Sequence, residues 1–296
     1  MTKAPRPAGE MLGAHVSTQG GVDTAPGRAE AIGATALQLF TKTPNQWREP
    51  AIDAETRARF QDEMKRTGMR AAVSHDSYLI NLASPDAELS ARSVNSFIAE
   101  LQRCEYLGIP YVVSHPGNYI DDQRRGLDAN AANYARCLAK VPGKVMVLLE
   151  TTAGTGTALG RSFEELAELR ALIPEAHRAR VGFCADTCHL FSAGYDLLND
   201  YDGVWKRWEA VLGLQQLRCL HLNDSKTPFD SHRDRHELIA EGSLGAEPFR
   251  RIMADPRLGH TIKILETPKG DDMVTLDRKM LRRLRAYVRG PERPPR

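Results

Sequence analysis

Six short apolar stretches of the sequence end in a residue that can bind a metal ion or carry a proton. These end residues are His75, His115, Glu150, Asp186, His221 and Glu266. In each stretch the residue two positions earlier is aliphatic or a cysteine, and residues i and i−2 of a strand point to the same face of a sheet. The pattern predicts six strands that turn an apolar side chain inward and then place a polar group at one end. His15 has the matching place in a further apolar stretch.

A single histidine in such a place is more often a hydrogen-bonded core residue than a ligand, but six groups in register are hard to explain by packing. Three carboxylates and three imidazoles that meet in a poorly solvated space would repel one another and lose hydration unless cations neutralised them. Histidine and carboxylate together are typical ligands of zinc, and manganese or iron also accept them. The residues therefore predict a metal centre.

Three more residues extend this set. His189 follows Asp186 by three positions, a spacing that puts both on one side of a helical turn. In the tripeptide Asp-Arg-His at 234–236, an extended backbone turns Asp234 and His236 to one side and Arg235 to the other. Read alone, this tripeptide is more often a surface turn. Its position after the seventh apolar stretch predicts that it completes a second, adjacent site.

The stretch GFCADTCHLFSAGYD at 182–196 also contains two thiols. Strand parity turns Cys184 into the interior below Asp186, so we expect Cys184 and Cys188 to be buried thiols and Asp186 and His189 to be the working pair. The five cysteines are scattered and odd in number, which fits reduced thiols and predicts no disulfide.

Eight strands alternating with helices would place these groups. The apolar segments are MLGAHVS, ALQLFTK, RAAVSHD, YVVSHPG, VMVLLET, VGFCADT, LRCLHLND and IKILETP. Helical periodicity separates them, most clearly at 87–108, which stops at Gly108, and at 162–176, where Ser162 and Glu165 form a capping box. The alternation predicts an α/β fold, a (β/α)8 TIM barrel with its site at the C-terminal ends of the strands.

The length of the chain limits the possible domain organisation. The 296 residues fit one barrel domain over 11–289, between flexible tails at 1–10 and 290–296. The basic run at 278–289 is expected to be the last barrel helix.

A net charge of +2 leaves nucleic-acid binding to a local patch. The N-terminus lacks a signal-peptide pattern, and the longest aliphatic run is too short to cross a bilayer. We therefore expect a cytoplasmic protein without a membrane partner.

The motifs together resemble the endonuclease IV family, the trinuclear-zinc apurinic/apyrimidinic endonucleases of base excision repair. The matching stretches are GAHVSTQGG (13–21), HDSYLINLASP (75–85), SHPGNY (114–119), LLETTAGTG (148–156), DTCHLFSAGYDL (186–197), HLNDSK (221–226), DRHELIAEGSLG (234–245) and ILETP (264–268). The resemblance implies a xylose-isomerase-like barrel that binds three Zn²⁺ ions. By position, one ion would be held by His75, His115 and Glu150, a second by Glu150, Asp186, His221 and Glu266, and a third by His189, Asp234 and His236.

The resemblance also implies an activity. The family hydrolyses the phosphodiester 5′ to an abasic site in duplex DNA, leaving a 3′-hydroxyl and a 5′-deoxyribose phosphate, and removal of 3′-blocking groups is expected as well. Water activated by the metal ions would attack the phosphate, because zinc lowers the pKa of bound water to about 7. Glu266 is the first candidate to orient this water, and Glu150 is the next. We expect a monomer without an obligate protein partner, associated with the nucleoid in a bacterium.

An abasic nucleotide must leave the duplex stack to reach a recessed centre. The family pattern assigns the inserted side chains to FTKTPNQWRE (40–49) and SYLIN (77–81), which indicates Tyr78, Leu79 and Asn45. An arginine is common at the position of Asn45. Further departures are Thr151, Thr155 and the AEG at 240–242, where asparagine, glutamine and GEG are usual. The candidate phosphate contacts are Lys42, Lys226 and Arg235.

Two other functions fit parts of the pattern. A sugar isomerase or epimerase with a xylose-isomerase-like barrel needs one or two metals and no Asp-x-His of a third site. A catalytically silent DNA-binding relative would lack a bridging ligand, and none is missing. The presence of His189, Asp234 and His236 favours the nuclease.

Overall fold

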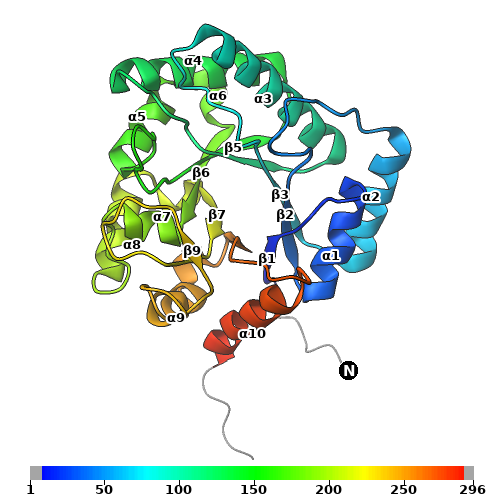
Figure 1. Cartoon of the computed structure of the whole chain (residues 1–296), viewed down its shortest axis with the longest axis vertical. Helices are drawn as coiled ribbons and strands as arrows, with labels where there is room; N and C mark the ends of the chain where they lie inside the picture. The colour runs from blue at the N-terminus through cyan, green and yellow to red at the C-terminus, as the bar shows by residue number, and fades with distance from the viewer. Residues whose placement is uncertain (1–8, 290–296) are drawn as a thin grey trace, which may run out of the picture.

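The computed structural model describes residues 9–289 and shows a closed barrel of parallel strands inside a ring of helices (Figure 1). Each of the eight predicted apolar segments forms one barrel strand, so the predicted fold class is confirmed. The strands are β1 (Leu12–His15), β2 (Ala36–Leu39), β3 (Ala71–His75), β4 (Tyr111–Ser114), β5 (Met146–Glu150), β6 (Val181–Asp186), β7 (Leu217–His221) and β10 (Ile262–Leu265). The barrel closes where β1 pairs with both β2 and β10.

Helices connect the strands and cover the outside of the barrel (Figure 1). They are α1 (Ala25–Ile32), α2 (Ala54–Thr67), α3 (Ala87–Leu107), α4 (Gln123–Lys140), α5 (Phe163–Leu172), α6 (Glu175–Arg178), α7 (Thr187–Ser192), α8 (Tyr201–Val211), α9 (Glu247–Ala254) and α10 (Thr275–Arg289). The 3₁₀ turns are η1 (Val22–Thr24), η2 (Leu214–Gln216) and η3 (Pro256–Leu258). Helix α3 ends as predicted, at Gly108 with a φ of 78°, a left-handed conformation that glycine adopts without strain.

Helix α5 differs from the predicted span of 162–176. It begins as expected, because the Ser162 side chain accepts a hydrogen bond from the main-chain N–H of Glu165. The Glu165 carboxylate, however, accepts from the N–H of Gly160, so the reciprocal half of the capping box does not form. The helix stops at Leu172 because Pro174 disfavours helical geometry at the residue before it.

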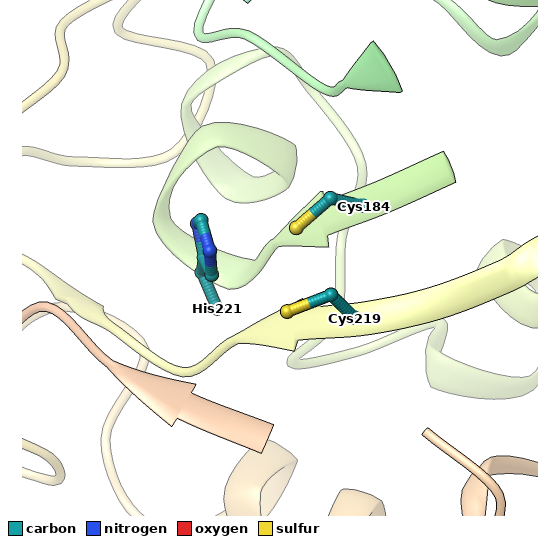
Figure 2. Close-up of side chains that lie close together, drawn as sticks. All are labelled: Cys184, Cys219 and His221. Atoms are coloured by element: carbon teal, nitrogen blue, oxygen red, sulfur yellow. The ribbon is translucent and has the colours of Figure 1, made fainter. Parts of the chain in front are cut away.

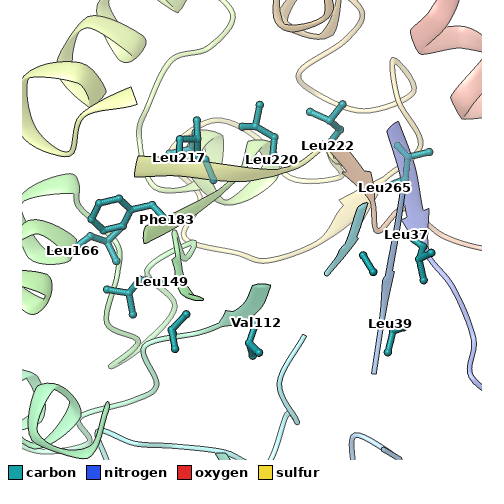
Figure 3. Packing of buried hydrophobic residues seen from close by; sticks show 14 of the residues in the cluster. Leu37, Leu39, Val112, Leu149, Leu166, Phe183, Leu217, Leu220, Leu222 and Leu265 are labelled. Atoms are coloured by element: carbon teal, nitrogen blue, oxygen red, sulfur yellow. The ribbon is translucent and has the colours of Figure 1, made fainter. Parts of the chain in front are cut away.

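Strand parity divides the apolar residues into an inner and an outer layer. The inner layer fills the barrel and consists of Ala36, Ala71, Val73, Val113, Leu148, Cys184, Cys219, Ile262 and Ile264. The outward-facing residues pack against the helices, as Figure 3 shows for Leu166 of α5 beside Phe183 and Leu149. The residue two positions before each polar strand end is predicted to point into the barrel. The inner layer contains all of these residues.

The two ends of the described chain differ in how they contact the barrel. The predicted N-terminal tail includes Glu10, whereas in the structure Glu10 forms an ion pair of 2.6 Å with Arg285 of α10. Glu10 is thus held against the barrel just before β1, and most of both predicted tails lies outside the described residues. The apolar face of α10 ends before Val288, whose side chain is exposed. Within residues 9–289, no helix has the length and apolar character needed to cross a membrane.

Candidate metal centre

The polar strand ends meet at the mouth of the barrel, together with residues from the following loops. Three groups of metal-binding side chains form there, and within each group the ligand atoms lie within 4.8 Å of one another. The groups are His75, His115 and Glu150; Glu150, Asp186, His221 and Glu266; and His189, Asp234 and His236. The structure thus brings together all nine residues in the three sets that the sequence predicts.

Glu150 joins the first group to the second. Its Oε2 atom lies 3.3 Å from Nε2 of both His75 and His115, and its Oε1 atom lies 2.8 Å from Nδ1 of His221. Burial alone would raise the pKa of this carboxyl, but His221 and the neighbouring imidazoles hold the pKa well below its usual range. Glu150 is therefore an ionised, fully buried group that can bridge two cations.

The third group combines helix α7 with a short hairpin. This hairpin pairs β8 (Asp224–Ser225) with β9 (His236–Glu237) in antiparallel fashion. The two oxygens of Asp234 each lie 3.2 Å from an imidazole nitrogen, one of His189 and one of His236. Asp186 accepts from the N–H of His189 with one oxygen, while its other oxygen lies 3.6 Å from His236. Asp186 therefore connects the second and third groups.

Main-chain carbonyls orient several of the imidazoles. In three of them Nδ1 lies close to a carbonyl oxygen: His75 (Asp76 O, 2.9 Å), His189 (Thr151 O, 2.8 Å) and His236 (Glu266 O, 3.2 Å). Because a carbonyl can only accept, Nδ1 of each ring carries a proton, and Nε2 is the ring atom that faces the carboxylates. The Nε2 atoms of His189 and His236 are buried without a hydrogen-bond partner. This donor set fits a metal ion, which accepts lone pairs from both imidazole and carboxylate.

Gln38, at the end of β2, is a site residue that the sequence analysis does not include. Its Nε2 donates to Glu266 Oε1 at 2.6 Å, and its Oε1 accepts from His221 Nε2 at 2.8 Å. The second contact holds the His221 ring so that Nδ1 is directed at the carboxylates of Glu150 and Glu266. A signal for Gln38 is present in the sequence, because it stands two positions after the inward-facing Ala36. An amide is not a typical metal ligand, so a search for metal ligands passes over it.

Two residues that depart from the family pattern have defined contacts. Thr151 Oγ1 accepts from the N–H of Asp186 at 3.0 Å, and the Thr151 carbonyl orients His189. Thr155 donates through its hydroxyl to the carbonyl of His232 at 2.8 Å. Both threonines therefore support loops around the centre without acting as ligands.

A cavity of about 710 Å³ opens above the centre, and Tyr78 and His115 are among its lining residues. The Tyr78 side chain is 71% exposed and rests edge-on against Phe40, with ring centroids 5.2 Å apart. Leu79 is half-buried and Asn45 is exposed. These positions leave Tyr78 available to an incoming ligand.

The three basic residues near the mouth differ in their exposure and in their contacts. Arg235 is exposed, and the Lys226 side chain is 51% exposed, with its ammonium group 3.8 Å from Glu237. Lys42 does not fit the predicted phosphate contact. Its ammonium group is buried and bound to Glu49 at 2.6 Å and to Ser96 Oγ at 3.0 Å. Lys42 holds the 40–49 loop against α3 instead.

The fold and this centre define a class of protein. The profile of the xylose isomerase-like TIM barrels matches residues 26–287. A D-tagatose 3-epimerase-like protein has the same fold, with a TM-score of 0.69 at 15% identity over 94% of this chain and 98% of that chain.

Other proteins are similar in sequence as well. A probable endonuclease 4 from Chloroflexus aggregans is 47% identical over 282 residues, which cover 94% of this chain and 98% of that protein. The crystal structure of endonuclease IV from Thermus thermophilus superposes with a TM-score of 0.83 at 36% identity, over 94% of this chain and 99% of that chain. The chain belongs to the endonuclease 4 family, and the resemblance predicted from its motifs is confirmed.

Proposed function

We propose that the chain is an apurinic/apyrimidinic endonuclease of DNA repair that hydrolyses the phosphodiester 5′ to an abasic site. The observation that carries this proposal is the set of three ligand groups joined through Glu150 and Asp186 at one barrel mouth. The third group, with Asp234 on a loop and His236 at the start of β9, is the part that a sugar isomerase or epimerase does not need. Likeness to the epimerase-like protein at 15% identity concerns the fold alone.

Zinc is the ion that this mixed histidine and carboxylate set favours, with manganese or iron as alternatives at individual groups. Three ions would be held by the three groups. When bound, such ions lower the pKa of water and neutralise charge on a phosphate. The protein's own contribution is to hold the nine ligand side chains around that phosphate.

Glu266 is the residue we assign to orient the attacking water, with Glu150 as a bridging support. Burial alone would raise the pKa of Glu266, but His221 and His15 hold the pKa well below its usual range, so the group is a carboxylate that can accept a hydrogen bond from water. Its side chain is 18% exposed, whereas Glu150 is fully buried. Glu266 is therefore the one of the two carboxylates that substrate water can reach from the cavity.

Duplex DNA with an abasic site is the proposed partner. Tyr78 and Leu79 would enter the gap left by the missing base, with Asn45 beside them, and Lys226 and Arg235 would contact phosphates. The same centre would remove 3′-blocking groups, because these are also phosphate esters at a strand break. A monomer in the cytoplasm, at the DNA, would suffice for this activity.

The test combines metal analysis with incision of a duplex that contains a tetrahydrofuran abasic analogue. We expect about three metal ions per chain, cleavage 5′ to the analogue, and loss of cleavage after prolonged chelation. Glu266→Gln should fold normally and lose incision by several orders of magnitude. Glu88→Gln, whose side chain is 85% exposed on α3, is the matched control and should cut like the wild type. One metal ion, no incision and turnover of a ketose would refute the assignment.

A further inference from the structure

A pair of cysteines lies one layer below the metal centre. Cys184 of β6 and Cys219 of β7 belong to the apolar layer that fills the barrel. The register between the two strands shifts by one residue just before Cys184, so that Cys184 faces Cys219 and Asp186 faces His221. Without this shift Cys184 would face Arg218, and the two thiols would not oppose each other.

The two sulfurs and His221 form a compact donor set. Figure 2 shows both Sγ atoms directed toward the side where the His221 ring lies, and the two sulfurs and one ring nitrogen lie within 4.8 Å of one another. All three side chains are buried, with no exposed surface. Around the two sulfurs the inner layer supplies apolar neighbours such as Leu148 and Ile264. Two sulfurs and one imidazole suit a soft cation that accepts few ligands.

We propose that Cys184, Cys219 and His221 form a separate binding site for a thiophilic divalent cation, and that this site competes with the metal centre for His221. Both thiols lose their protons to the solvent when the ion binds. The two thiolates then balance the two positive charges, so the complex adds no net charge to the apolar layer. This neutrality avoids the cost of burying an unpaired ion.

The competition follows from the contacts of the His221 ring. Nδ1 lies 2.8 Å from Glu150 and 3.1 Å from Glu266, and Nε2 donates to Gln38 at 2.8 Å. Both nitrogens are therefore already engaged in the centre above. An ion bound by the cysteines takes one of these nitrogens and breaks a contact that the second ligand group needs.

Two of the other three thiols provide controls. Cys137 lies on α4 and donates to the carbonyl of Val94 at 3.7 Å, away from any group of metal-binding side chains in residues 9–289. Cys188 lies near Asp186 and His236, a set with one sulfur only. Substitution of Cys137 or Cys188 distinguishes a paired-thiol site from binding by either of these two single thiols.

The probe is Cd²⁺, titrated into chelator-stripped full-length protein kept reduced without a thiol reagent. We expect an ultraviolet sulfur-to-cadmium charge-transfer band in the wild type and in Cys137→Ala and Cys188→Ala. The band should be absent from Cys184→Ala and Cys219→Ala. Cys184→Ser and Cys219→Ser, which keep the side-chain size, should also lack it, and circular dichroism checks that each variant is folded. Loading first with Mn²⁺, which favours the carboxylates and imidazoles of the centre over thiolates, should weaken the band because His221 is then held by the centre, and a band unchanged by Mn²⁺ would overturn the competition.

A band that persists in the folded Cys184 and Cys219 variants, or no band in the wild type, would overturn the proposal. Loss of the band in Cys188→Ala alone would assign the sulfur ligand to the set formed by Asp186, Cys188 and His236. That result would overturn the proposal as well. The readout contains no DNA. A failure here is therefore distinct from a failure of the proposed endonuclease activity.

Discussion

Gln38 and Glu266 are separated by 228 residues in the chain, yet their side chains form a 2.6 Å hydrogen bond across the closure of the barrel. The same Gln38 amide also holds His221. One neutral side chain thus fixes the carboxylate proposed to orient water and the ring that serves the second ligand group. Partners of this kind set the direction and basicity of metal ligands.

Replacing Gln38 by leucine should therefore weaken the centre without unfolding the barrel. We expect Gln38→Leu to lose about 10- to 100-fold in incision rate or metal affinity, because Glu266 and His221 lose their shared partner. Metal content and single-turnover incision on the same sample measure the effect. Gln215→Leu, at an exposed site before β7, is the control. Equal activity and metal content in the two variants would remove Gln38 from the machinery.

Tyr78 should contribute to DNA binding and not to the stability of the fold. Its ring is largely exposed and touches Phe40 only at an edge, so Tyr78→Ala removes little buried area. Stacking of an aromatic ring on a base contributes about 1–3 kcal/mol, and we expect binding of abasic duplex to weaken about tenfold or more. Fluorescence anisotropy with abasic and intact duplex measures this. Val288→Ala, an exposed apolar residue on α10, should bind like the wild type, and an unchanged affinity in Tyr78→Ala would exclude insertion.

Lys226 and Arg235 should act through phosphates, so their effect depends on salt. Each contact with a phosphate changes the slope of log affinity against log salt by about one. Lys226→Ala and Arg235→Ala should therefore each lower the slope by about one on every duplex sequence. Lys206→Ala, on the outer surface of α8, should leave the slope unchanged. A slope that stays at the wild-type value in both mouth variants would show that DNA is positioned elsewhere.

Ala240 gives a prediction on stability. Its φ is 63°, a left-handed conformation that costs a residue with a Cβ about 1–2 kcal/mol but costs glycine nothing. Ala240→Gly should raise Tm by about 1–3 °C, since the relief of strain exceeds the added freedom of glycine in the unfolded chain. Ala132→Gly, in the middle of α4, should lower Tm by a similar amount. If both substitutions lower Tm, the loop does not store this strain.

Strand parity explains how much of the site could be predicted. The rule that residues two apart share a face needs only the order of residues, so it locates the strands, the inner layer and the polar groups at the mouth. It also places Cys184 below Asp186, where the structure has it. Gln38 obeys the same rule, but its amide does not mark it as a metal ligand. Its role depends on contacts with Glu266 and His221 that form only when the barrel closes.

Contacts between distant segments could not be predicted in this way. Lys42 lies beside the ligand loops in sequence, but its burial depends on Glu49 and on Ser96 of α3, which no local pattern connects to it. The end of α5 at Leu172 is a local matter, because Pro174 is visible in the sequence and is sufficient to stop the helix. Local sequence patterns therefore predict the helices and strands, whereas ion pairs between distant segments can be identified only in the folded structure.

The three ligand groups differ in what holds them. Glu150 is a strand residue with no exposed surface, whereas Asp234 belongs to a loop, is 50% exposed and depends on the two-residue pairing of β8 with β9. A cation on the third group would accordingly exchange with bulk solvent sooner than one on the strand-borne groups. If each group holds one ion as proposed, partial depletion would empty the third group first and leave ions on the other two groups.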